Sequence, residues 1–149
     1  MKIQTLVPAV LTILSIALHA ATPEQEKAFI DSYKKAFEEK DTKTLEAFLL
    51  TDGASADLVE MFKGMQGMDA GSKISSIELV TPSKEDVAKY SKPMEMPDGK
   101  KYKMPIKPVK QLVIVIERKD GESSSKSTTK KPVAEKNGKL VIPVPVPAK

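Results

Sequence analysis

The spacing of the apolar residues changes once along this chain, near Gly71, and this change constrains the fold more than any other feature. Before it, apolar residues recur every three or four positions, as on one face of an α-helix, whereas after it they tend to alternate, as in a β-strand. Helices that come before the strands, rather than between them, favour an α+β fold. We therefore predict N-terminal helices followed by a meandering sheet.

Three helices are predicted in the first half of the chain. Thr22, Pro23 and Gln25 mark the start of the first, because they suit a helix cap, the first helical position and the closing position of a capping box. A short second helix is expected after Asp41, and a third from about Ser55. The apolar stripe of the first helix consists of Phe29, Ile30, Tyr33, Ala36 and Phe37.

Strands are predicted in the second half. The expected strands cover 74–80, 110–118, 123–131 and 140–146, and a hairpin is expected within 92–106. The number of strands between 82 and 108 is left open.

The end of the chain, 143–149, is rich in proline, and proline cannot donate a hydrogen bond to a strand ladder. The two residues Asn137 and Gly138 predict a tight hairpin turn before this segment. We therefore expect 143–149 to be an edge strand or an extended C-terminal tail.

The strand expected in the centre of the sheet carries apolar residues on both of its faces. One face has Leu112, Ile114 and Ile116, and the other has Val113 and Val115. An apolar strip on the outer face of a small domain is often a contact between copies. Val113 and Val115 therefore predict a homodimer through the outer face of the sheet.

The first 20 residues have the order of a secretory signal peptide: a positive start, an apolar run and then small residues. We expect cleavage after Ala20, with Ala21 as the alternative, which leaves 21–149 as one domain. The apolar run is shorter than the roughly 20 residues of a spanning helix, so no stable membrane insertion is expected after processing. The open alternative is an uncleaved anchoring helix. Export without cysteine favours a bacterial periplasm or exterior.

The only histidine, His19, lies in that segment, and the chain has no cysteine. The processed chain would have neither an imidazole nor a thiol, which excludes Ser-His-Asp and Cys-His nucleophiles and the usual zinc sites. Methionines such as Met94 and Met96 offer the soft ligands that Cu(I) prefers, but methionine more often fills gaps in cores. We therefore predict no metal site and no cofactor.

Charge is divided unevenly between the two halves of the chain. Residues 21–80 carry 7 lysines and 12 acidic residues, whereas residues 81–149 carry 16 basic and 8 acidic residues. Because the positive charge is nearly all lysine and no nucleic-acid motif is present, a solvated face is favoured and no nucleic-acid partner is expected. The alternative is a basic face for an anionic partner, centred on Lys100, Lys101, Lys103, Lys107 and Lys110.

Two stretches carry a family resemblance. The first helix ends in Ala36-Phe37-Glu38-Glu39-Lys40-Asp41 and is followed by Leu45, Phe48-Leu49-Leu50 and Thr51-Asp52-Gly53. The central strand is followed by Glu135-Lys136-Asn137-Gly138-Lys139-Leu140-Val141-Ile142. Over about residues 22–146, these patterns resemble nuclear transport factor 2-like domains. The resemblance implies a cone in which helices cover a curved, mainly antiparallel sheet, with a cavity between them.

In such a cone the inward side chains would line a ligand pocket. We expect an exported binding or interaction domain without catalytic activity, which holds an apolar small molecule in that pocket. The alternative function is a cofactor-free isomerase or lyase, with Tyr33 as hydrogen-bond donor and Asp57 as general base. A further alternative is that the same side chains close on one another as a dry core. The expected pocket residues are Phe29, Tyr33, Phe37, Phe62, Met65, Leu112, Ile114 and Ile116.

Export predicts a processed N-terminus. The intact mass of protein purified from its source organism should correspond to a chain that begins at Ala21 or Thr22. Recovery of the full-length chain from the cytoplasm would contradict the signal-peptide prediction.

Overall fold

The computed structural model describes residues 20–149, and in this part of the chain three helices precede most of the strands. The fold is α+β, which confirms the predicted class. Nearly all of the predicted signal peptide, including His19, lies outside these residues. The helices are α1 (Pro23–Glu38), α2 (Thr42–Ala47), α3 (Ala56–Gly67) and α4 (Lys84–Tyr90).

The strands of the described part form two sheets. The larger sheet has the order β1-β7-β6-β5-β2, and the smaller one has the order β3-β4-β8. Only β1 and β7 pair in parallel, and the other pairs in these residues are antiparallel, as predicted. The strands are β1 (Leu49–Leu50), β2 (Ile74–Val80), β3 (Met94–Glu95), β4 (Lys101–Lys103), β5 (Lys110–Asp120), β6 (Ser123–Lys136), β7 (Lys139–Pro143) and β8 (Val146–Pro147).

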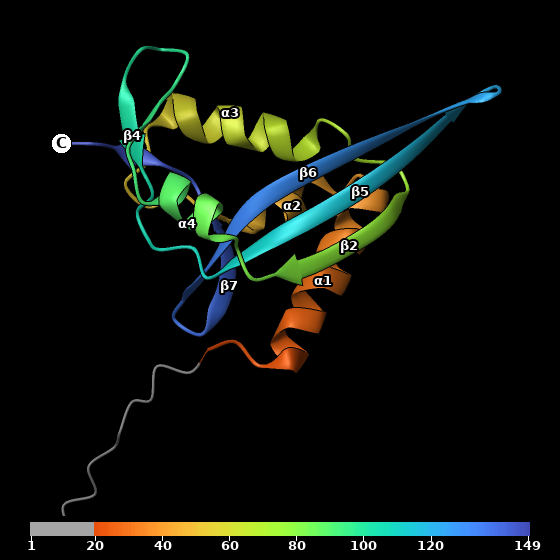
Figure 1. The fold of residues 1–149 in the computed structure, drawn as a ribbon, viewed down its shortest axis with the longest axis horizontal. Helices are drawn as coiled ribbons and strands as arrows, with labels where there is room; N and C mark the ends of the chain where they lie inside the picture. Colours follow the sequence, from red (N-terminus) through yellow and green to blue (C-terminus); the bar gives the residue numbers. More distant parts are fainter. Residues whose placement is uncertain (1–19) are drawn as a thin grey trace, which may run out of the picture.

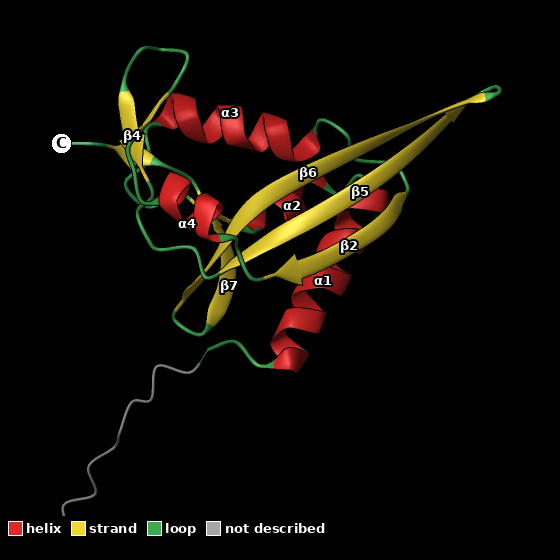
Figure 2. Cartoon of the chain, in the orientation of Figure 1, coloured by secondary structure: helices red, strands yellow, loops and turns green. Residues whose placement is uncertain are grey.

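The helices are placed unequally around the larger sheet. In Figures 1 and 2, α1 and α2 lie behind β2, β5 and β6, and α3 runs along the side nearer β6. On the other face, the Tyr90 hydroxyl at the end of α4 accepts a hydrogen bond from Gln111 Nε2 (2.7 Å). Both figures show β5 and β6 continuing past the other strands as a long two-stranded ribbon.

The main core forms where the apolar stripe of α1 meets the inner face of β5. Phe48, which follows α2, closes this core, since its ring centroid lies 5.0 Å from that of Phe29 and 5.3 Å from that of Tyr33. Burial of aromatic and aliphatic side chains from a helix and a strand gives each element its main tertiary support. The buried residues of this core are Phe29, Tyr33, Ala36 and Phe37 from α1, and Leu112, Ile114 and Ile116 from β5.

The helix starts lie where the sequence predicts them. Thr22 Oγ1 accepts a hydrogen bond from the Gln25 amide (3.2 Å), and Gln25 Oε1 accepts one from the Thr22 amide (2.8 Å), which completes the capping box. Asp41 caps α2 by accepting a hydrogen bond from the Thr44 amide (3.1 Å). The residue before α3 is Ser55, as expected.

Most of the predicted strands and turns are also found, but the strand expected over 123–131 continues to 136, and the strand expected over 140–146 is divided into β7 and β8. The bounds of β2 coincide with the predicted 74–80, and β3 and β4 pair within the region where a hairpin was expected. Asn137 (φ 52°) and Gly138 (φ 75°) both have the left-handed backbone that a two-residue hairpin turn requires. They connect β6 to β7 as predicted.

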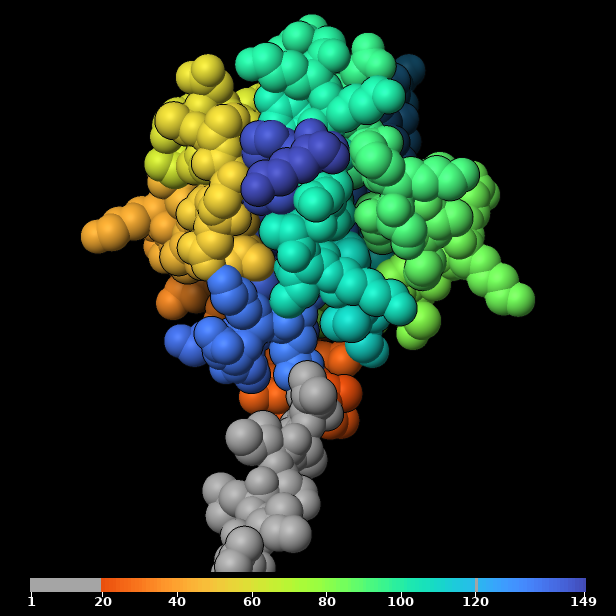
Figure 3. Space-filling model, turned by 90° about the vertical axis from the view of Figure 1, so that its left-hand side faces the viewer, coloured from red at the N-terminus to blue at the C-terminus, as the bar shows by residue number. Residues whose placement is uncertain are grey.

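The proline-rich end of the chain packs closely against the domain. Pro143, Val144 and Pro145 are fully buried, and the Val144 amide donates a hydrogen bond to the Leu50 carbonyl (2.9 Å). Pro143 fits at the end of β7 because it lies beyond the last pair of β7 with β6, and Pro147 fits in β8 because β8 is the edge of the smaller sheet. Figure 3 shows the C-terminal residues in the middle of one surface, between α3 and the β3–β4 hairpin.

The cap of α1 yields a stability prediction. Thr22→Ala removes one hydrogen bond of the capping box, so it should lower the free energy of unfolding by about 1 kcal/mol. Urea titration followed by circular dichroism measures this change. Thr22→Ser is the matched control, because it keeps the hydroxyl and should retain most of the stability. Equal unfolding midpoints for Thr22→Ala and the wild type would contradict the prediction.

Candidate functional site

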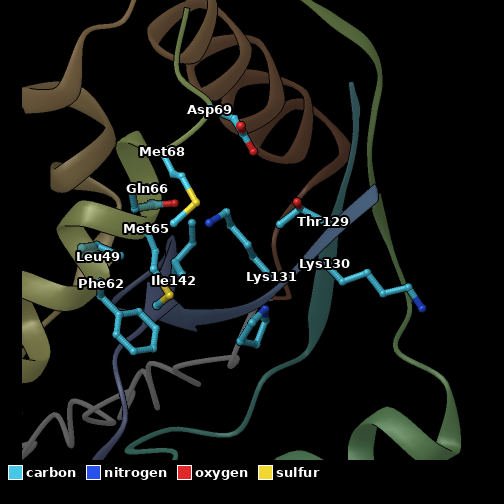
Figure 4. Close-up of a pocket in the computed structure, with 11 residues that line it drawn as sticks. Leu49, Phe62, Met65, Gln66, Met68, Asp69, Thr129, Lys130, Lys131 and Ile142 are labelled. Atoms are coloured by element: carbon cyan, nitrogen blue, oxygen red, sulfur yellow. The ribbon is translucent and has the colours of Figure 1, made fainter. Parts of the chain in front are cut away.

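A pocket of about 310 Å³ opens between α3 and β6, and we call it the α3–β6 pocket. Its size lies at the lower end of the range found for small-molecule sites. Figure 4 shows the side chains that line it. They are Leu49, Phe62, Met65, Gln66, Met68, Asp69, Thr129, Lys130, Lys131, Pro132 and Ile142.

One wall of the pocket is apolar and comes mainly from α3. Phe62, Met65 and Gln66 recur at helical spacing, so they lie on one side of this helix. Met65 is 40 % exposed and Met68, directly after the helix, is 75 % exposed. Large apolar side chains left open to solvent beside a hollow mark a contact or binding surface more often than isolated ones do.

The opposite wall is β6, and it places one lysine toward the pocket. Lys131 pairs with Leu112 of β5, so both lie on the inner face of the sheet, toward the helices. Figure 4 shows the Lys131 side chain reaching toward Met65 and Met68, whereas the neighbouring Lys130 points away. The alternation of a β-strand thus places a positive charge on the same face as the buried Leu112 and Val133, next to the uncharged Thr129.

Burial dominates the electrostatics of Lys131. Desolvation lowers the pKa of its ammonium group below the usual lysine value, and the negative charge of Asp69 opposes this shift. Within residues 20–149, the Lys131 ammonium group has neither a hydrogen bond nor a salt bridge. Asp69, the acidic residue whose charge acts on Lys131, already forms an ion pair with Arg118 of β5.

The floor of the pocket is a buried amide, Gln66, which is only 2 % exposed. Its Oε1 accepts a hydrogen bond from the Tyr33 hydroxyl (2.9 Å), and its Nε2 donates one to the Leu45 carbonyl (3.3 Å). Burial raises the pKa of Tyr33, so this hydroxyl stays protonated and remains a donor. Gln66 therefore ties α3 to α1 and α2.

The predicted pocket residues divide into three groups. Phe62 and Met65 line the α3–β6 pocket. Phe37, Ile114 and Ile116 reach only a void of about 20 Å³ beside it, which is the room of about one water molecule. The remaining three, Phe29, Tyr33 and Leu112, lie in the packed core together with Phe48.

The structure does not bring Tyr33 and Asp57 to one site. The Tyr33 hydroxyl is buried against Gln66, whereas Asp57 lines a second pocket of about 440 Å³ at the N-terminal end of α3. In that pocket the Tyr102 hydroxyl donates a hydrogen bond to Asp98 (2.6 Å). A hydrogen-bond donor and a general base must converge on one substrate, and this pair does not.

Sequence reasoning missed the polar residues of the α3–β6 pocket. Lys131 lies at the end of a stretch rich in serine, threonine and lysine, which reads as an exposed strand. The available signal is that this strand continues past Val133, so that Lys131 lies on the same face as a buried valine two residues further along. Gln66 has no comparable signal, because its role depends on the approach of α1 and α2.

The outer face of the larger sheet is mixed in character. Val113 and Val115 are half-buried there, and Val113 lies between Glu78 of β2 and Lys130 of β6. The apolar strip is therefore short and flanked by charged or polar side chains, since Val115 lies between Ser76 and Thr128. The homodimer through Val113 and Val115 stays a prediction.

Comparison with models of protein families, with curated proteins and with solved structures finds no match for this chain. None of the helices within residues 20–149 is both long and apolar enough to cross a membrane. In the same part of the chain, no three acidic, histidine or cysteine side chains gather as a metal site would need.

The buried contact between Tyr33 and Gln66 yields a prediction for a double-mutant cycle. Tyr33→Phe leaves the buried Gln66 oxygen without its donor, so it should lower the free energy of unfolding by about 1–3 kcal/mol. Gln66→Met removes the other partner. Together the two changes should cost less than the sum of the single changes, as measured by urea unfolding of all four proteins. Strict additivity would show that the two side chains are not coupled.

Proposed function

We propose that this chain is an exported small-molecule-binding domain without catalytic activity, and that the α3–β6 pocket is its ligand site. One observation carries the proposal. The methionine-lined wall of α3 stands partly open to solvent opposite Lys131, whose ammonium group has no hydrogen bond or salt bridge within residues 20–149. Such a combination of an apolar wall and a few convergent polar groups is typical of ligand sites.

The apolar wall is suited to a flexible ligand. Thioether side chains adapt to the shape of what they contact, and here Met65 and Met68 are both accessible. A water molecule occupies about 30 Å³ in the liquid, so a pocket of about 310 Å³ has room for about ten groups of that size. This capacity fits a small aliphatic molecule.

The polar groups of the pocket favour binding over catalysis. Gln66 is held by two hydrogen bonds, and Asp69 forms an ion pair with Arg118. General acid–base chemistry needs two groups that can exchange protons with one substrate. In the described lining, Lys131 is the titratable group that points inward without a partner.

We also propose that the domain has the nuclear transport factor 2-like arrangement. Two observations support this proposal. The helices α1 and α2 lie on one face of the larger sheet, and β6 and β7 form a hairpin through the turn at Asn137 and Gly138. The small sheet formed by β3, β4 and β8 is an addition to that arrangement.

Binding of a neutral fluorescent dye tests the proposal. Nile red should gain fluorescence with the wild-type protein, and Met65→Glu should weaken its binding at least tenfold, because a carboxylate would enter the apolar wall. Fluorescence titration measures both affinities.

Met61→Glu is the matched control. Met61 lies one turn earlier on α3, has a similar exposure of 37 % and lines the second pocket instead. It should leave dye binding unchanged. Loss of binding in Met61→Glu with full binding in Met65→Glu would move the site to the second pocket, and no dye binding by the wild type would overturn the proposed function.

A further inference from the structure

We propose that the ligand of the α3–β6 pocket is an amphipathic anion, a short aliphatic chain that ends in a carboxylate, and that the Lys131 ammonium binds this carboxylate. This inference rests on the proposed function. It adds the chemical class of the ligand and the residue that selects it.

The position of Lys131 is the first argument. On the inner face of the larger sheet, Lys131 has apolar neighbours on two sides, with Leu112 opposite on β5 and Val133 two residues further along β6, and the uncharged Thr129 two residues before it. A cation in such surroundings loses part of its hydration without gaining a partner. An apolar residue would serve the fold better at this position, so the lysine points to a role in binding.

The local charges are the second argument. Asp69 is paired with Arg118, and the Lys130 ammonium lies 4.0 Å from an Asp86 carboxylate oxygen on the outer side of the sheet. These two pairs each balance their own charge. The Lys131 ammonium is therefore the charged group of the described pocket that has no opposite charge paired with it, and the pocket carries an unpaired positive charge. A bound carboxylate would balance it through a charge-assisted hydrogen bond.

The direction of the pocket is the third argument. In Figure 4, Phe62 lies at one end, Asp69 lies toward the other, and the Lys131 ammonium lies beside Met65 and Met68 between them. A chain whose carboxylate meets Lys131 can lay its carbons along Met65 and Phe62. Octanoate has ten heavy atoms, which matches room for about ten groups.

The stability of Lys131 variants separates a binding role from a structural one. Burial lowers the pKa of Lys131 in the folded chain, so the charged form destabilises the fold most fully at pH values below that folded pKa. The groups that also face or flank it are Asp69, Arg118 and Lys130. Lys131→Met should therefore unfold at the same or a higher temperature than the wild type at pH 7. A lysine kept for structure would give the opposite result.

Paired ligands test the proposal directly. Octanoate and octan-1-ol share a chain length but differ in charge, and both are titrated against the Nile red complex. In the wild type, octanoate should displace the dye at concentrations about tenfold lower than octan-1-ol. Lys131→Met and Lys131→Gln should abolish this preference while they keep the affinity for octan-1-ol. Lys126→Met, which changes an exposed lysine of the same strand that does not line the pocket, should keep the preference.

The outcomes distinguish the two proposals. If both ligands displace the dye equally from the wild type, or if the preference survives in both Lys131 variants, the carboxylate assignment is wrong and the binding function stands. If the dye itself does not bind the wild type, the binding function fails and the carboxylate assignment fails with it.

Discussion

The contact between the α1 stripe and the inner face of β5 supports the rest of the structure. Phe29, Tyr33 and Phe37 follow a helical repeat, whereas Ile114 and its neighbours follow a strand repeat, and the two patterns meet in one buried layer. Each element can bury its apolar face only against the other. The positions of α2, β2 and β7 follow from this layer, because each of them contacts α1 or β5 directly.

The third helix is held in a different way. Gln66 joins α3 to the Tyr33 hydroxyl and the Leu45 carbonyl by hydrogen bonds, so directional polar contacts set the approach of this helix. Near its N-terminal end, α3 is also held by apolar packing, because Leu58 is buried against Tyr102 and Val144. Near its C-terminal end, Met65 and Met68 stay open beside Lys131.

Local signals predicted most of the fold, and contacts between distant residues decided most of the site. The Thr22 capping box and the turn at Asn137 and Gly138 depend on adjacent residues, so they could be predicted from the sequence. The cavity could not, because its place depends on Phe48, whose ring packs against Phe29 and Tyr33 and fills the space above β5. The open space is therefore displaced toward α3, and Phe62 and Met65 are the expected pocket residues that line it.

The ribbon formed by β5 and β6 affects how copies of this chain meet in solution. In the described pairing, β2 extends along β5 only as far as Ile116, and β7 reaches β6 only from Ala134 onward. Both outer edges of the ribbon tip are thus open, and open edges recruit further strands. The tip offers small serines and Lys126 instead of apolar side chains. Stacking of one β6 edge on the β6 edge of another copy would bring two Lys126 side chains together without apolar contact at the serines, which disfavours growth of an intermolecular sheet from this edge.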